Sequence, residues 1–473
     1  MNRPLPFAAA ALLLAAFAPS QDVVAVKGGR ILTITGPTID DGVVLIESGR
    51  ITKIARTADV EIPWTAKVID ATGKVVMPTW VVAHSQAGQR GLNENMQNVP
   101  WLSVADAIDP AATYFEDALR NGVGTIHVLP GNQTLLGGTG MVVRPAGRTV
   151  EDMAVAANTG IKLSLASSGG GRLQQIRRLR RAIEDVREYL ADFDRRKAEF
   201  DQEQAAGAIP ADKTWTEQID RTKKAACDLV QKKTKGWLFV PSAAELDEAL
   251  RLSQQLDLVL VLGANIDEGV MLLTKLAQPV VLDDEIEYYE TDEETQKEHK
   301  VCTAKLLADA GVPFALSLGL GGPTSYPWWQ LGTCVRNGVD RRLAIEALTT
   351  VPARLLGLQD QVGSLSEGKL GNLQILTGDP LQATTWVETV VLEGNVVYQR
   401  SEDPKLKYLF ARDKDMAAKA AADKAKDQAK ATDDAADGDP ANRPPAKAAD
   451  GGGDGPAPKR DGDGKQPNDG GAR

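Results

Sequence analysis

Histidine is scarce in this sequence of 473 residues, which contains only His84, His127 and His299. His299 lies in the charged stretch 296–300, which we expect to form a solvated helix, so at most two histidines are available for an internal site. Imidazoles and carboxylates are the usual ligands of transition metals. Two histidines without a paired carboxylate make a weak metal site at best.

Cysteine is equally rare, with Cys227, Cys302 and Cys334 as the three thiols. An odd number leaves at least one thiol outside any disulfide within the chain. The spacing of the three residues matches no zinc-binding signature. We therefore expect buried, unreactive thiols.

Long apolar runs are also missing, and the best candidate is the segment from Phe7 to Phe17, which is too short to span a bilayer. Arg3 precedes this run, and the small residues Ala18 and Ser20 follow it. The pattern predicts a secretory signal peptide over residues 1–20 and an exported protein, periplasmic or extracellular. An uncleaved membrane anchor stays open as the alternative. No other stretch predicts an integral membrane protein.

Positive charge is in deficit, since the formal net charge is -10 at pH 7. Binding to phosphate backbones requires a basic surface, so the balance argues against a general nucleic-acid-binding protein. Hydrophobic residues make up 43% of the chain and charged residues 25%, as in an ordinary soluble protein.

The order of the expected elements predicts an α/β protein. Strand-like segments at 22–76 and 360–402 are expected to pair into a small composite β-sandwich. Between them, residues 77–359 alternate strands with helices, which favours a (β/α)8 TIM-like barrel. Residues 172–235 read as a helical excursion from the barrel, and residues 413–473 as a disordered low-complexity tail. The strand candidates of the barrel are 80–83, 124–129, 161–166, 237–240, 258–262, 280–282 and 314–318.

One segment resembles a known family. Residues 68–78 have the sequence VIDATGKVVMP, and residues 83–88 have the sequence AHSQAG. Together these two stretches resemble the first barrel strand of the amidohydrolase superfamily, in its imidazolonepropionase-like branch. Further stretches agree with the second strand and its loop, the last barrel helix and the return to the sandwich. They lie at 122–125, 130–132, 137–140, 347–357 and 363–369. The resemblance covers about residues 22 to 400.

The resemblance implies metal-assisted hydrolysis of non-peptide or dipeptide carbon–nitrogen bonds, with zinc or another divalent ion at the mouth of the barrel. His84 is the only ligand position of the motif that is retained, and Gln86 stands in place of the second histidine. No carboxylate or bridging lysine is found near 165–168. The other expected ligand positions hold Pro241, the segment 262–264 and the segment 317–319, which reads Ser-Leu-Gly.

Several polar residues are candidates for a catalytic or substrate-binding site. His84, Asp283 and Asp284 are the candidates for catalysis, because all three follow or end expected barrel strands. The candidates for substrate binding are His127, Asn132, Gln86 and Trp328. A structural role for the histidines and an acidic loop at 283–294 are the alternatives.

Two functions stay open at this stage. The first is a metal-free, catalytically lapsed member of the family, a pseudoenzyme that acts as an exported binding or assembly module with no cofactor. The second is an active amidohydrolase with a rearranged metal or acid/base site, which would use zinc or another divalent metal. The expected partner is an unidentified small molecule or protein, and a homo-oligomer is compatible with the family resemblance.

Overall fold

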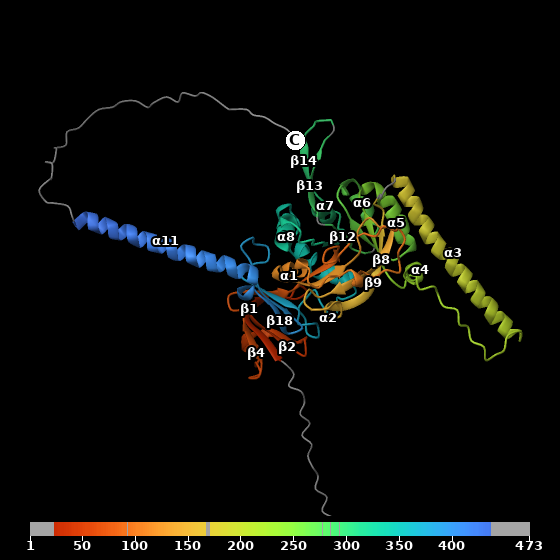
Figure 1. Ribbon diagram of the computed structural model, residues 1–473, viewed down its shortest axis with the longest axis horizontal. Helices are drawn as coiled ribbons and strands as arrows, with labels where there is room; N and C mark the ends of the chain where they lie inside the picture. The colour runs from red at the N-terminus through yellow and green to blue at the C-terminus, as the bar shows by residue number, and fades with distance from the viewer. Residues whose placement is uncertain are drawn as a thin grey trace, which may run out of the picture. The chain divides into compact units, whose positions relative to one another are not determined.

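The computed structural model describes residues 23–91, 93–166, 171–276, 278–283, 285–292 and 294–436 (Figure 1). The predicted signal peptide at 1–20 lies outside these residues. The chain divides into two compact units, one ending at Lys407 and one beginning at Tyr408. In the described part of the chain, no helix has the length and hydropathy needed to cross a bilayer.

An eight-stranded sheet forms a nearly closed barrel in the order β15-β12-β11-β10-β9-β8-β7-β6. Seven strands run parallel, whereas β8 runs antiparallel to its neighbours β7 and β9. The segment 347–348 lies between the two edge strands, because its carbonyl groups accept hydrogen bonds from Val81 of β6 and Leu316 of β15. The strands are β6 (Trp80–Ser85), β7 (Val123–Val128), β8 (Leu136–Val143), β9 (Ala154–Ser164), β10 (Gly236–Val240), β11 (Leu258–Leu262), β12 (Val280–Leu282) and β15 (Phe314–Leu316).

The barrel strands are apolar over nearly their whole length, as expected for parallel strands that are covered on both faces. Every residue of β11 and β12 is buried. One cluster combines side chains of β6, β10, β11, β12 and β15, which places it inside the ring of strands. The helices of this region are α1 (Thr113–Arg120), α2 (Val150–Met153), α5 (Leu246–Gln255), α6 (Val270–Leu273), α7 (Thr303–Asp309), α8 (Pro327–Arg336), α9 (Arg341–Glu346) and α10 (Thr350–Leu355).

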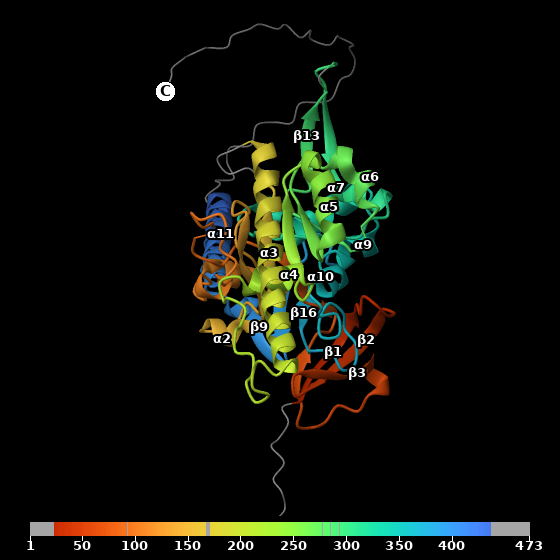
Figure 2. The same cartoon turned by 90° about the vertical axis from the view of Figure 1, so that its right-hand side faces the viewer.

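Both flanks of the barrel region pair into a second sheet, in the order β18-β17-β16-β5-β1-β2-β3 with β4 beside β1. The predicted composite sandwich is thus a single hydrogen-bonded sheet with its own apolar cluster. Figure 2 shows β1, β2 and β3 beside the barrel. The strands are β1 (Val23–Ile31), β2 (Ile39–Glu47), β3 (Arg50–Arg56), β4 (Lys67–Asp70), β5 (Val75–Pro78), β16 (Leu373–Leu376), β17 (Val387–Leu392) and β18 (Asn395–Gln399).

Two features project from the barrel (Figure 1). The region 172–235 contains the long helix α3 (Arg172–Ala205) and the short helix α4 (Lys224–Val230), and α3 buries an apolar stripe that includes Leu179, Ile183 and Val186. The second feature is a hairpin of β13 (Glu287–Thr291) and β14 (Glu298–Cys302). The predicted helix around His299 is therefore wrong, because this residue pairs with Glu290 across the hairpin.

Helix α11 extends from Pro404 to Ala436, so the alanine-rich first part of the predicted tail, 413–436, is helical; the composition of this part left a frayed helix open as the alternative to disorder. Alanine and lysine, which dominate this segment, are strong helix formers. The remaining part of the predicted tail, 437–473, lies outside the described residues.

Candidate functional site at the barrel mouth

A pocket of about 490 Å³ opens at the edge where the parallel strands end. Sites of barrel proteins lie at this edge because the loops that follow the strands converge there. The lining comes from the segments that follow β6, β10, β11, β12 and β15. It consists of Ser85, Gln86, Ala87, Phe239, Pro241, Gly263, Ala264, Asp283, Glu285, Ser317 and Gly319.

Beside this pocket, His84 at the end of β6 meets Lys162 of β9. Their side chains are 1% and 0% exposed, and Nζ of the lysine lies 2.9 Å from Nε2 of the imidazole. Burial lowers the pKa of Lys162 to about 7, although the charge of Asp283 acts in the opposite direction. The amine also lies 5.7 Å from the ring centre of Phe239, which lines the pocket.

The other ring nitrogen of His84 faces Asp283, with 4.0 Å between Nδ1 and Oδ1. Burial holds the pKa of His84 well below its usual value, and the nearby Lys162 and His127 lower it further. The imidazole is therefore neutral at pH 7. When the lysine is protonated it can only donate, so Nε2 then accepts and the ring proton lies on Nδ1.

Asn132, from the connection between β7 and β8, completes this group. Its Nδ2 lies 3.4 Å from Oδ2 of Asp283. Two atoms here are buried without a hydrogen-bond partner among the described residues, namely Nδ1 of His84 and Oδ1 of Asn132. The hydroxyl of Ser317 donates to the carbonyl of His84 at 2.7 Å, which fixes the end of β6 against the segment after β15.

His127 has a different environment. Its Nδ1 donates to the carbonyl of Ala83 at 2.9 Å, and its Nε2 accepts from the hydroxyl of Thr159 at 2.8 Å. The ring packs on Trp237 with 4.5 Å between the ring centres. Burial lowers the pKa of His127 to about 3. Both nitrogens are engaged within the sheet, so this histidine on β7 connects to β6 and to β9.

The remaining candidates are spread out. Gln86 lines the mouth pocket, whereas Trp328 does not; its ring lies 5.8 Å from that of Trp329 in helix α8. Asp284 lies outside the described residues. Glu285 follows the same strand as Asp283 and lines the pocket beside it.

Lys162 is the site residue that sequence reasoning missed. The resemblance placed a lysine or carboxylate near 165–168, and the buried amine belongs to a residue just before that window. One signal was present, because Lys162 interrupts the apolar run of a predicted strand. A charged side chain at such a position requires a partner inside the protein.

The residues at the mouth do not fit a divalent metal. Among the residues that the structure describes, no group of three or more histidines, cysteines and carboxylates converges. The imidazole nitrogen Nε2 of His84 is already hydrogen-bonded to an amine. The positions that the resemblance assigns to ligands present Gln86, Pro241, Gly263 and Ser317 to the pocket, and none of these is a good zinc ligand.

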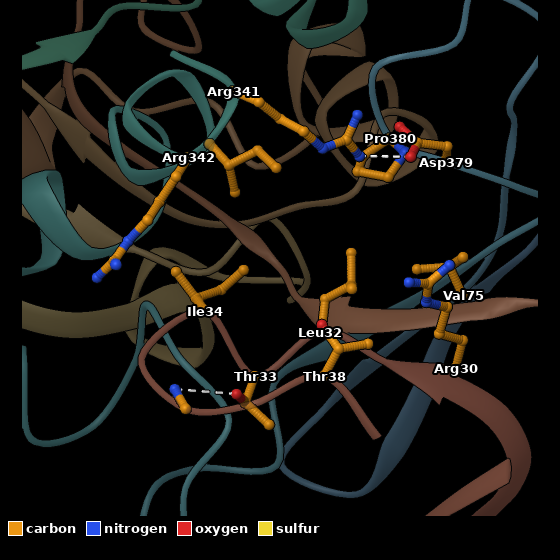
Figure 3. A pocket seen from close by; sticks show the side chains of 12 residues that line it. Arg30, Leu32, Thr33, Ile34, Thr38, Val75, Arg341, Arg342, Asp379 and Pro380 are labelled. Atoms are coloured by element: carbon orange, nitrogen blue, oxygen red, sulfur yellow. Dashed lines mark hydrogen bonds and ion pairs between the residues drawn. The ribbon is translucent and has the colours of Figure 1, made fainter. Parts of the chain in front are cut away.

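A second pocket of about 380 Å³ lies where β1 and β5 approach helix α9 (Figure 3). Arg341 points toward Asp379, with which it forms an ion pair. Arg30 pairs with Asp40, and Arg342 pairs with Glu346. Each guanidinium therefore already has a carboxylate partner, and the apolar floor of Leu32, Ile34 and Val75 offers no reactive group.

The chain is similar to known amidohydrolases in part of its sequence and in its barrel fold. The sequence model of the amidohydrolase family matches residues 275–398. An amidohydrolase from Thermotoga maritima MSB8 is similar in structure, with a TM-score of 0.69 and 24% sequence identity, over 80% of this chain and 100% of that one. At this identity the likeness establishes the fold.

Two characterised relatives match a short segment. A 5'-deoxyadenosine deaminase of Methanococcoides burtonii is 42% identical over 84 residues, 16% of this chain and 18% of that protein. A 5-methylthioadenosine/S-adenosylhomocysteine deaminase of Symbiobacterium thermophilum is 35% identical over 82 residues, 16% of this chain and 19% of that protein. The chain thus matches less than a fifth of the length of either relative. Together, the family match and the shared fold confirm the resemblance of this chain to the amidohydrolase superfamily.

Proposed function

We propose that this protein is a metal-free relative of the amidohydrolases that acts as an exported binding or assembly module, with the pocket at the barrel mouth as its small-molecule site. The observation that carries the proposal is the contact between Lys162 and His84. An amine takes the imidazole nitrogen that the family resemblance assigns to a metal. A zinc ion requires three or four nitrogen, sulfur or oxygen ligands at about 2 Å, and the described residues of this pocket offer no such group.

Metal analysis of the purified protein tests this proposal. The protein is incubated with zinc, passed through a desalting column and analysed by mass spectrometry for bound metal. We expect no stoichiometric metal, and the same result for His84→Ala. Equimolar zinc in the unmodified protein that is lost in His84→Ala would reject the metal-free proposal.

A second function is supported by the order Asp283, His84, Lys162. A neutral imidazole between a carboxylate and an amine of lowered pKa can pass a proton, which is the basis of acid/base catalysis. An active hydrolase or deaminase with this rearranged site is therefore the alternative. Hydrolysis assays with dipeptides, cyclic amides, lactones and 5'-deoxyadenosine test it, with Lys162→Met as the inactive control. Turnover that this substitution abolishes would establish the alternative in place of a lapsed enzyme.

Export and assembly are separate parts of the proposal. Cell fractionation of the full chain and of a variant without residues 1–20 tests export, and we expect only the full chain outside the cytoplasm. Chemical cross-linking of the full chain, compared with a chain that ends at residue 412, tests an assembly role for residues 413–473. A cross-linked partner or homo-oligomer that is lost on truncation would support this role, and equal cross-linking of both chains would contradict it.

A further inference from the structure

We infer that the pocket at the barrel mouth binds a neutral polyhydroxylated molecule, such as a saccharide or polyol, with one hydroxyl group seated between His84 and Asn132. This inference rests on the proposed function, because it assumes that the pocket binds a ligand without a metal. It names the chemical class of the ligand.

The first argument is the pair of buried atoms without partners. When the lysine amine donates to Nε2, Nδ1 of His84 carries the ring proton and is a donor, whereas Oδ1 of Asn132 is an acceptor. A polar atom that is buried without a hydrogen-bond partner is unfavourable, so these two atoms favour a polar ligand group beside them. A hydroxyl group both donates and accepts hydrogen bonds, and it therefore has the chemistry that each of the two atoms lacks.

The second argument is the position of these atoms. Both residues flank Asp283, since Nδ1 lies 4.0 Å and Nδ2 of Asn132 lies 3.4 Å from its carboxylate oxygens. Asp283 itself lines the pocket. A ligand hydroxyl that reaches this corner thus meets a carboxylate, an amide and an imidazole. Polar groups at such close spacing suit the adjacent hydroxyls of a polyol.

The third argument is charge. Asp283 and Glu285 line the pocket, and no lysine or arginine is among the described residues of its lining. The buried amine of Lys162 is turned to His84. Negatively charged ligands are repelled by two carboxylates in a partly enclosed space, so anionic sugars and organic acids are excluded. The amide oxygen of Gln86 and the hydroxyls of Ser85 and Ser317 add neutral hydrogen-bonding groups.

The fourth argument is the aromatic wall. The ring of Phe239 lines the pocket and is partly exposed. A flat apolar face beside convergent polar groups accommodates a ring that has polar edges and an apolar face. A sugar ring has this character, whereas a small polar amine or acid does not.

The test is calorimetric titration of the full chain with methyl glucoside, trehalose and myo-inositol, and with gluconate and glucosamine as charged analogues. We expect measurable binding of at least one neutral compound and none of gluconate. Asn132→Leu, which keeps the side-chain volume and removes both polar atoms, is expected to weaken that binding at least tenfold. Gln133→Leu changes the next residue, whose side chain is exposed, and is the matched control that keeps wild-type affinity.

Each outcome decides the inference. Binding of gluconate in preference to its neutral analogues, or equal affinity in Asn132→Leu and Gln133→Leu, would overturn it. The absence of binding to all three neutral compounds would also overturn it while the metal-free proposal stands. Stoichiometric zinc in the unmodified protein would instead reject the metal-free function that we propose and on which the inference depends. Circular dichroism of both variants verifies that a loss of affinity does not reflect a loss of fold.

Discussion

Replacing Lys162 by methionine is expected to remove a pH dependence of stability that is specific to this residue. In the folded chain, burial lowers the pKa of Lys162 to about 7 from an ordinary value of 10.5. Between these two pH values the unfolded chain holds one more proton at this lysine than the folded chain does. The free energy of unfolding therefore rises with pH, by about 1.4 kcal/mol per pH unit. The rise over the whole interval is on the order of 5 kcal/mol.

Urea denaturation at pH 7, 8, 9 and 10 measures this effect, with tryptophan fluorescence as the signal, since Trp237 is fully buried in the barrel. All other side chains are common to both proteins, so the difference between wild type and Lys162→Met isolates the one residue. The methionine variant also leaves Nε2 of His84 without its donor, which adds a cost that does not vary with pH in this range. Parallel stability curves from pH 7 to 10 would refute the reasoning, because they would show that the lysine keeps its ordinary pKa.

Three further predictions concern the rest of the fold. Arg120→Ala leaves the buried carboxylate of Asp403 without its ion pair and should cost about 3 kcal/mol in urea denaturation at pH 7. Because the hydrogen bond from Arg120 lowers the pKa of Asp403, this cost should shrink as the pH falls through the folded pKa of that carboxyl, and a constant cost down to pH 2 would contradict it. Gly140→Ala places a methyl group 2.6 Å from Nε2 of His127 and should lower the free energy of unfolding by about 1–3 kcal/mol. An unchanged melting temperature would contradict this, because it would show that β8 shifts to accommodate the methyl group. Burial raises the pKa of the Cys334 thiol, so we expect no labelling of it by a thiol reagent at pH 8 until the chain unfolds, as site-resolved mass spectrometry would show.

The barrel strands were the most predictable part of the fold. The strand predictions at 258–262 and 280–282 coincide with β11 and β12, because short apolar runs bounded by polar residues are typical of buried parallel strands. Strand β8 was missed, since the glycines at 137–140 indicated a loop. Close packing requires glycine here, because a Cβ atom on Gly138 would lie 2.6 Å from the carbonyl oxygen of Leu102. A contact between residues so far apart in the chain cannot be predicted from the local sequence pattern.

The site was predictable only in part. The ends of β6 and β12 indicated that His84 and Asp283 share one edge of the barrel, and the structure places them 4.0 Å apart. The partner of His84 could not be predicted from spacing, because Lys162 comes from another strand. For the same reason, the engagement of both nitrogens of His127 became visible only in the folded barrel, because the two partners come from β6 and β9.

The reversed direction of β8 has a consequence for how this mouth can change. A parallel strand after β7 would need a crossover helix, whereas here residues 129–135 turn directly back at the rim. The ends of this turn are fixed in the core, because Leu129, Thr134 and Leu135 are buried, so length changes without effect on the layers beneath are confined to its exposed tip at Gln133. Asn132 lies next to this tip, so changes there alter the contact with Asp283 while the amine and imidazole stay in place.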